Sequence, residues 1–294
     1  MDYAPDTDDQ APMTCPTTPS NPPRALIAAM QSLLGPSWSD KVAGLGQQRA
    51  LMDRQAGKRF HDARLGEAFI QAILTGTGAP WGRVRPALDD VRALLRDYDP
   101  SYWPTLNDGD SDALYACLKG HHACGQRTRR MLRLGMQCLQ VLHHHAGAYG
   151  SLEAFLADRL KAHHSSVIGL LRDLGTPGPY KLPGMRVAIA AEALKNAGFD
   201  TLKPDLHIRR FAACLGIFAF RRWDASKPYG APPTSEGETI RLLVAMHEFA
   251  VAAGVSDITL DNLAWLVCSS LEGGGFHLPN QALRKLGQSA GLLA

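Results

Sequence analysis

The amino-acid sequence predicts an all-α fold. Apolar residues recur at intervals of three and four along several segments, which places them on one face of a helix. Glycine and proline stand between these segments, where they end helices and begin connections. Runs in which β-branched residues alternate with polar ones, the pattern of a half-buried strand, are missing from the sequence.

The first half of the chain holds four helical segments. Residues 24–34 are the first, and they end at Gly35 and Pro36, a glycine followed by a residue that cannot continue a helix. Residues 128–145 are the longest, with apolar side chains on one face at helical spacing. The two segments between these are residues 68–74 and 87–96, separated by Gly76, Gly78 and Pro80.

The second half contributes the remaining helices, and no internal repeat of fixed period relates them. Residues 152–172 are long enough for two helices. Residues 226–238 contain three prolines and three small polar residues, which predicts a surface loop that separates two groups of helices. The other helical segments are residues 188–197, 208–215, 240–253 and 260–270.

The composition is that of a chain with a sizeable core. It has 294 residues, of which 45% are hydrophobic, so its length permits one or two domains. No run approaches the roughly 18 consecutive apolar residues that a membrane helix needs. Six scattered cysteines indicate free thiols in a reducing cytoplasm. The formal net charge of +3 permits a nucleic-acid partner without requiring one.

Three stretches are distinguished along the chain. Residues 1–23 are acidic and rich in proline and threonine, with neither the basic start nor the apolar run of a secretory signal, so we expect a disordered tail. Residues 24–272 form the helical body. Three glycines beginning at Gly273 predict a short C-terminal tail over residues 273–294.

Residues 180–210 carry the most informative pattern. Leu182, Pro183 and Gly184 precede an alanine-rich helix, so the glycine lets unpaired backbone N–H groups approach a ligand, which suits a phosphate. Further along, Asp205 follows a proline. It is surrounded by four potentially cationic residues, Lys203, His207, Arg209 and Arg210. This combination suits an anionic polymer on which a positive charge develops during reaction.

This segment resembles the helix-hairpin-helix DNA glycosylases. Its Leu-Pro-Gly turn, its alanine-rich helix and a Pro-Asp-x-His-x-x-Arg element, whose aspartate lies 21 residues after Gly184, look like the hairpin and the catalytic aspartate of that superfamily. Residues 69–84 are similar to the family's early helix and the loop that approaches the flipped base. Residues 127–134 are similar to the helix that leads into the hairpin. The resemblance spans about residues 64–215.

The resemblance implies a fold, an activity and a partner. The fold would be two helical lobes with a helix-hairpin-helix motif and an interlobe cleft. The activity would be monofunctional hydrolysis of the N-glycosidic bond of a damaged base after base flipping, in base-excision repair. Asp205 would be catalytic, stabilising an oxocarbenium-like sugar and orienting water. The partner would be double-stranded DNA with a damaged, preferably alkylated, base; we expect no cofactor, no membrane, and a monomer in the cytoplasm, associated with the nucleoid.

The resemblance also implies two groups of binding residues. Contacts to DNA are expected from Lys181, Gly184, Arg186, Val187, His207 and Arg209. The base pocket is expected to include Thr77, Trp81 and Trp38. Tryptophan is suited to this role because an aromatic face stacks on a base whatever its identity.

Several departures from the family pattern bear on the chemistry. Arg186 stands where the second hairpin glycine is usual, and residues 175–179 interrupt the expected first hairpin helix. Ala188 occupies the position of the Schiff-base lysine of bifunctional members, so no AP-lyase activity is expected. No closely spaced set of four cysteines follows Asp205, so the iron–sulfur cluster of some members is not expected.

Each feature also has a simpler structural explanation. An aspartate after proline is often a helix N-cap, and Trp81 and Trp265 suit a helical core. Adjacent histidines on a helix diverge by about 100° and do not converge on one ion, so no metal is expected. The least unfavourable metal-binding set is Cys117, Cys124 and His121.

Two other functions remain open at this point. One is a non-catalytic helix-hairpin-helix protein that binds DNA and recognises lesions or bent structures. The other is a helical protein in which Leu-Pro-Gly and Pro-Asp occur by chance. DNA affinity that falls with salt distinguishes the first of these from the second, because phosphate contacts release counterions.

Overall fold

The structure, a computed structural model, describes residues 21–224, 226–269 and 275–293. Within these ranges the chain is all-α, as predicted, and contains no β-strand. Three single-turn segments, η1 (Arg85–Ala87), η2 (Arg96–Tyr98) and η3 (Trp103–Thr105), lie between longer helices. The helices are α1 (Pro22–Leu34), α2 (Trp38–Ala43), α3 (Gln47–Gln55), α4 (Asp62–Thr75), α5 (Trp81–Val84), α6 (Leu88–Leu94), α7 (Asp108–Gly120), α8 (Thr128–Tyr149), α9 (Leu152–Ala162), α10 (Val167–Gly175), α11 (Val187–Asn196), α12 (Leu206–Cys214), α13 (Glu236–Ala253), α14 (Asp257–Cys268) and α15 (Asn280–Ser289).

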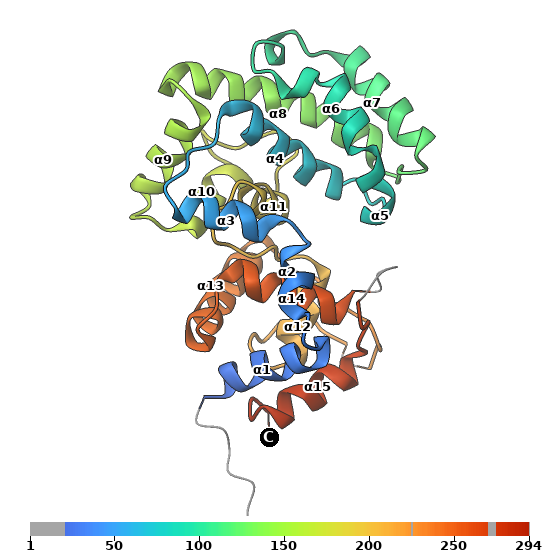
Figure 1. The fold of residues 1–294 in the computed structure, drawn as a ribbon, viewed down its shortest axis with the longest axis vertical. Coiled ribbons are helices and arrows are strands. Elements are labelled where there is room, and N and C mark those ends of the chain that lie inside the picture. The colour runs from blue at the N-terminus through green and yellow to red at the C-terminus, as the bar shows by residue number, and fades with distance from the viewer. Residues whose placement is uncertain (1–20, 225, 270–274, 294) are drawn as a thin grey trace, which may run out of the picture.

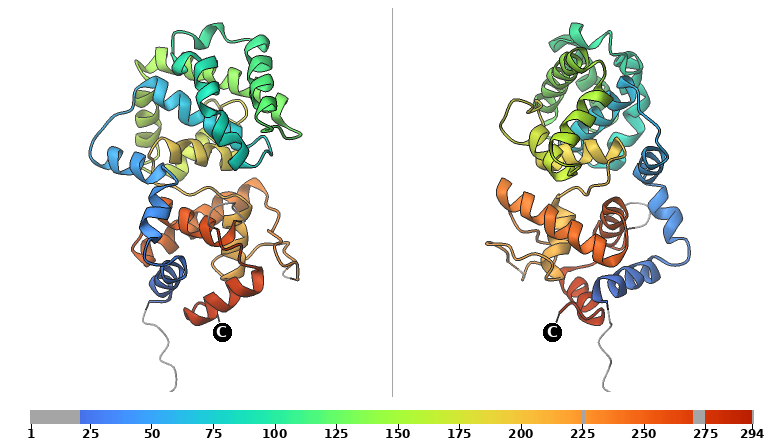
Figure 2. Two further views of the ribbon diagram at one scale, coloured as in Figure 1. Left: turned by 45° about the vertical axis from the view of Figure 1, so that its right-hand side comes forward. Right: turned by 90° about the vertical axis from the view of Figure 1, so that its left-hand side faces the viewer.

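The helices form two groups, one above the other in Figure 1. The lower group, here called the terminal lobe, combines both ends of the described chain, because α1 and α2 pack with α12–α15. The upper group, the central lobe, is the continuous stretch α3–α11, in which α4 packs along α8 and α11. The turned views in Figure 2 keep the same division. Contacts of α3 with α14, and of α10 and α11 with α13, join the two lobes.

Helix α4 is the centre of the central lobe. Phe69 and Ile73 on this helix are buried in its core. Gly66 lets the ring of Trp103 approach, since a Cβ at this position would lie 2.4 Å from the ring. The Trp103 indole N–H donates to the carbonyl of Tyr98 at 3.1 Å, so the one polar atom of this buried ring has a partner.

The N-terminal boundary differs from the prediction. Residues 1–20 lie outside the described residues, but residues 21–23 belong to the fold rather than to a tail. The Asn21 side chain accepts a hydrogen bond from the Arg24 N–H at 3.0 Å and caps α1. Pro22 and Pro23 occupy the first turn of the helix, where a missing N–H costs nothing.

The C-terminal boundary is also different, because part of the predicted tail is a packed helix. Helix α15 contacts α1 and α12, and its Leu283 is fully buried. The Asn280 side chain donates to the carbonyls of Lys227 at 2.8 Å and Gly230 at 3.2 Å. The helix thereby fixes the loop that follows α12, and the predicted tail over residues 273–294 is corrected accordingly.

None of the helices in the described ranges combines the length and the apolar composition of a membrane span. Helices α13 and α14 meet the criteria of length and composition only as a pair, and they are bent by 99° relative to each other. Both pack in the terminal lobe against α1 and α12.

Candidate functional site

A cavity of about 840 Å³ lies between the two lobes. Helices α4, α5, α6 and α11 line it from the central lobe, and α12 and α14 line it from the terminal lobe. The start of α3 and the connection before it complete the wall. The volume falls in the range of about 300–1,000 Å³ that is usual for small-molecule sites.

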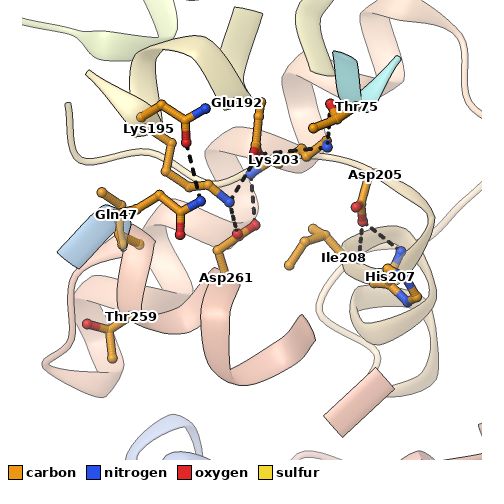
Figure 3. A network of polar contacts seen from close by, with 12 residues as sticks. Gln47, Thr75, Glu192, Lys195, Lys203, Asp205, His207, Ile208, Thr259 and Asp261 are labelled. Atoms are coloured by element: carbon orange, nitrogen blue, oxygen red, sulfur yellow. Dashed lines mark hydrogen bonds and ion pairs between the residues drawn. The ribbon is translucent and has the colours of Figure 1, made fainter. Parts of the chain in front are cut away.

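Asp205 lines this cavity and is the N-cap of α12. Its Oδ1 accepts hydrogen bonds from the backbone N–H groups of His207 at 2.7 Å and Ile208 at 3.3 Å (Figure 3). Its Oδ2 has no hydrogen-bond partner among the described residues. The positive end of the α12 dipole favours negative charge at this position. The structural explanation for Asp205 is therefore correct, and the same carboxylate keeps one oxygen for a ligand.

His207 lies beside Asp205 in the cavity wall. Its Nδ1 is buried and has no hydrogen-bond partner among the described residues. Burial lowers the pKa of this imidazole, although the nearby Asp205 carboxylate acts in the opposite direction. The ring is therefore neutral near pH 7, and any contact with a phosphate would be a hydrogen bond rather than an ion pair.

The two arginines after His207 hold backbone carbonyls outside the cavity. Arg209, an expected DNA contact, donates from Nη1 to the carbonyl of Pro232 at 2.9 Å. Arg210 is 2% exposed, and its Nη2 donates to the carbonyls of Cys268 and Leu278, both at 2.9 Å. Neither arginine lines the cavity wall. Because both donate to backbone carbonyls, both stabilise the packing of the terminal lobe.

A buried network of charges forms one wall of the cavity (Figure 3). Lys195 Nζ lies 2.5 Å from Asp261 Oδ2 and 3.1 Å from Glu192 Oε2. The Lys203 N–H donates to Asp261 Oδ1 at 2.9 Å, and Lys203 Nζ donates to Thr75 Oγ1 at 3.0 Å. Because its members come from α4, α11, α14 and the segment before α12, the network connects the two lobes.

The pKa values within this network move in different directions. Burial raises the pKa of Asp261 even though the Lys195 ammonium lowers it, and the negative charge of Asp205 raises it further. For Glu192 burial is outweighed by the ammonium groups of Lys195 and Lys203, which hold its pKa below the usual range. For Lys195 burial is outweighed by the two carboxylates, which raise its pKa. Burial of a single charge in this wall would be costly, and the pairing of opposite charges offsets that cost.

Glu67 is the centre of a second charged cluster on the cavity wall. The carboxylate lies 3.1 Å from Arg64 Nη1 and also pairs with Arg92. The Gln71 side chain donates to it at 3.2 Å. All four residues line the cavity, so α4 and α6 present a fixed, paired set of charges there.

Two tryptophans line the cavity from opposite lobes, Trp81 at the start of α5 and Trp265 on α14. Thr77 and Trp38, the other expected base-pocket residues, are not in its wall. Thr77 is fully buried, and its hydroxyl donates to the carbonyl of Leu74 at 2.7 Å, which holds the turn after α4. Trp38 begins α2 and packs as a half-buried residue against the core.

Two amide side chains in the cavity wall have buried atoms without a hydrogen-bond partner among the described residues. One is Nδ2 of Asn262, a residue that is only 2% exposed. The other is Oε1 of Gln47, whose Nε2 donates to the Asn196 side chain at 3.3 Å. Buried polar atoms are nearly always hydrogen-bonded. Among the described residues, these are the two amide side chains of the wall whose hydrogen bonding at buried atoms is incomplete.

Glycines shape the connection between α10 and α11. Gly184 has φ +73°, and a Cβ at this position would lie 3.0 Å from Leu134 Cβ on α8. A Cβ at Gly175, the last residue of α10, would lie 2.9 Å from Val187 Cα. The end of α10 and the start of α11 are therefore in close contact, and the helix ends where residues 175–179 were expected to interrupt it.

Within the described residues, unpaired backbone N–H groups lie at this connection beside the exposed side chain of Arg186. Arg186 is the N-cap of α11 but makes no side-chain cap. The N–H groups of Arg186 and Val187 have no partner among the described residues, while the Val187 side chain is buried. The Lys181 ammonium, expected to contact DNA, donates to the carbonyls of Gly175 at 2.6 Å and Met185. Lys181 therefore stabilises the connection between α10 and α11 through these two hydrogen bonds.

Exposed arginines lie on α8 close to this connection. Arg129 and Arg133 form ion pairs with aspartates of α7 at 3.1 and 3.6 Å. Arg127 and Arg130 are exposed and have no ion pair among the described residues. They lie one to two turns before Leu134, which contacts the connection at its glycine.

Sequence reasoning missed the residues that α14 contributes to the cavity. Asp261, Asn262 and Trp265 lie far from Asp205 in sequence, on a helix that reads as an apolar core element. One signal was available: Asp261 lies among apolar residues of this helix, and buried carboxylates are almost always paired.

Comparisons of this chain with family models, curated proteins and solved structures found no match.

Proposed function

We propose that this protein is a monofunctional DNA glycosylase that hydrolyses the N-glycosidic bond of a damaged base. The proposal is carried by Asp205, a carboxylate at a helix N-terminus in the wall of the interlobe cavity. One of its oxygens caps the helix, and the other has no partner in the part of the chain that the structure describes. The resemblance of residues 180–210 to the helix-hairpin-helix glycosylases supports the same assignment.

The mechanism follows from the placement of these groups. Unpaired N–H groups at the start of α11 would hold a phosphate, with Arg186, Arg127 and Arg130 nearby. The damaged nucleotide would leave the duplex and enter the cavity between Trp81 and Trp265. As the glycosidic bond breaks, positive charge develops on the sugar, and the Asp205 carboxylate would stabilise it and orient the attacking water.

The aromatic residues and Asp205 in the cavity wall suit a base that carries positive charge. Trp81 and Trp265 offer aromatic faces, which attract cations. The Asp205 carboxylate is the one acidic group of the wall without a lysine or arginine partner among the described residues, although the four cations and four carboxylates of the wall balance in formal charge. Alkylated purines, which are cationic when methylated on a ring nitrogen, are therefore the substrate class that we propose.

The test is a release assay with the purified protein and duplexes that carry one alkylated, deaminated or oxidised base. Monofunctional activity gives strand breaks only after alkaline cleavage of the abasic site, and no covalent adduct is trapped by borohydride. A trapped adduct would replace the proposal with a lyase mechanism, for which Lys203 is the lysine nearest to Asp205 in the sequence. No release from any lesion, together with salt-sensitive DNA binding, would identify a non-catalytic DNA-binding protein.

Replacing Trp265 with leucine tests the assignment of the base pocket. Leucine keeps apolar bulk in α14 but removes the stacking face, which contributes about 1–3 kcal/mol per base. We expect kcat/KM for the released base to fall by roughly 5- to 150-fold. Trp38→Leu is the control, because Trp38 does not line the cavity, and equal losses in the two variants would contradict the assignment.

Replacing Arg130 or Arg186 with alanine tests the DNA-facing surface. Each change removes one cation near the start of α11, so affinity for undamaged duplex should fall and the slope of log K against log salt should decrease by about one. Arg129→Ala is the matched control, because this side chain is already paired with Asp112 at 3.1 Å. A salt slope unchanged in Arg130→Ala and Arg186→Ala would place the DNA on another face.

A further inference from the structure

Three side chains with metal-binding atoms converge on the outer side of the central lobe. Asp90 comes from α6, Cys117 from α7, and His121 is the C-cap residue of α7. One carboxylate oxygen, the thiol sulfur and one imidazole nitrogen all lie within 4.8 Å of one another. Within the part of the chain that the structure describes, no other group of three such residues meets this spacing.

The local structure explains why these residues meet. Cys117 and His121 are four residues apart, and the His121 N–H donates to the Cys117 carbonyl at 3.2 Å, so helical geometry continues through the C-cap. Both side chains therefore lie on the same face of α7. Helix α6 packs against this helix, and Asp90 Oδ2 lies 2.7 Å from His121 Nε2. Cys124, which the sequence placed with Cys117 and His121, is not part of the group.

A surface pocket of about 530 Å³ opens at this point. The three candidate ligands are in its wall, and the small residues Ala93 and Ala116 leave space beside them. The pocket lies apart from the interlobe cavity, since the two share no lining residue. A ligand bound between Asp90, Cys117 and His121 would therefore remain open to solvent on one side.

We infer that Asp90, Cys117 and His121 form a binding site for a divalent transition metal of the zinc type, with a fourth coordination position open to the pocket. The donor set selects this class of metal. A thiolate and an imidazole suit Zn²⁺ and Co²⁺, whereas Mg²⁺ and Ca²⁺ prefer oxygen ligands alone. Three protein ligands with an open position are the arrangement that leaves room for water or an exogenous ligand.

The geometry needs only side-chain adjustment to close around an ion. At usual bond lengths, the tetrahedral sulfur, nitrogen and oxygen ligand atoms of such a site lie about 3.3–3.6 Å apart. The sulfur lies within 4.8 Å of the other two ligand atoms, so it must approach by at most little more than about an ångström. Asp90 and His121 must separate slightly from their present contact. The Asp90 side chain is 63% exposed and that of His121 33% exposed, so both can rotate without disturbing the core. The thiol would release its proton to solvent on binding.

Such a site would connect α6 to α7 and thereby hold α6 in position. Asp90 and Arg92 are two residues apart, so they lie on nearly opposite faces of α6. Arg92 pairs with Glu67 in the wall of the interlobe cavity, whereas Asp90 faces the outer pocket. The inference does not depend on the proposed glycosylase activity.

Titration of the metal-stripped full-length chain with Co²⁺ tests the site. Coordination of Co²⁺ by a thiolate gives a charge-transfer absorption that histidine ligands alone do not give, so the readout is specific for cysteine. We expect this absorption to saturate at one equivalent, to disappear on addition of Zn²⁺, and to be lost in Cys117→Ser. His121→Ala and Asp90→Asn should weaken binding by at least about tenfold.

Control variants of neighbouring residues and a thermal measurement test whether metal binding depends on these three ligands. Cys124→Ser and His122→Asn change the neighbouring cysteine and histidine, and both should bind Co²⁺ like the unaltered chain. Zn²⁺ should raise the melting temperature of the unaltered chain and of Cys124→Ser but not of Cys117→Ser. The inference is overturned if the unaltered chain shows no thiolate absorption with Co²⁺, or if Cys117→Ser retains it.

Discussion

Replacing Asp205 with asparagine is expected to reduce base release by at least about 10²–10³-fold, the usual loss when one preorganised charge-stabilising group is removed. The change is nearly isosteric, and asparagine is as good an N-cap as aspartate. The hydrogen bonds to the N–H groups of His207 and Ile208 should therefore persist, with only a charge–dipole loss of about 0.3–1 kcal/mol. DNA affinity should be unchanged or slightly higher.

The same position separates catalysis from capping when alanine is tested beside asparagine. Asp205→Ala should lower the free energy of unfolding by about 1 kcal/mol more than Asp205→Asn, because it removes the cap as well as the charge. If Asp205 were only a cap, Asp205→Asn would keep full activity. Excision assays and urea denaturation of both variants give the two effects independently, and full activity in a well-folded Asp205→Asn would reject the assignment.

Replacing Lys195 with methionine is expected to destabilise the fold by about 3–5 kcal/mol, the usual result when one partner of a buried ion pair is removed. Lys195 is 4% exposed and neutralises Asp261 and Glu192, so its loss leaves Asp261 as a buried charge without a cation. Chemical denaturation at pH 8 measures the effect. Lys58→Met is the matched control, since Lys58 pairs with Asp53 at 2.6 Å but is 58% exposed, and a loss below about 1 kcal/mol is expected there.

The loss in Lys195→Met should also depend on pH. Burial already raises the pKa of Asp261, and without Lys195 it rises further above the unfolded value. The folded state then binds the proton more tightly than the unfolded state, so stability is lost as the pH rises through the folded pKa. The variant should therefore recover part of its stability at pH 5. Adding Asp261→Leu should restore stability at pH 8, and equal destabilisation at both pH values would contradict this account.

The local pattern was sufficient to predict most helices but not all their limits. Residues 128–145 correspond to α8 and residues 188–197 to α11, because long amphipathic stretches depend little on distant contacts. Helix α15 was predicted as a tail because its single buried leucine, Leu283, depends on α12 and α1 for partners. The predicted start of α1 is two residues late, because two consecutive prolines resemble a linker. In the structure Asn21 caps the helix, and the prolines occupy its first turn.

For the candidate site too, residues in a local motif could be predicted, whereas contacts between distant segments could not. Asp205 and His207 could be found because a short motif holds both. Thr77 and Trp38 were assigned to the base pocket from the family resemblance, but Thr77 holds a turn and Trp38 packs against the core. Lys195 and Asp261 are 66 residues apart, so their ion pair depends on how α11 and α14 lie relative to each other.

The composition of the terminal lobe has a consequence for synthesis on the ribosome. Its first helix emerges early, but its partners are the last to appear: the Asn21 side chain donates to the carbonyl of Ala252, 231 residues later. At about 5–20 residues per second, α1 waits roughly 10–50 s before that contact can form. The central lobe is continuous and can pack during this interval. The wall of the cavity that carries Asp205 is therefore closed last, after α14 has left the exit tunnel.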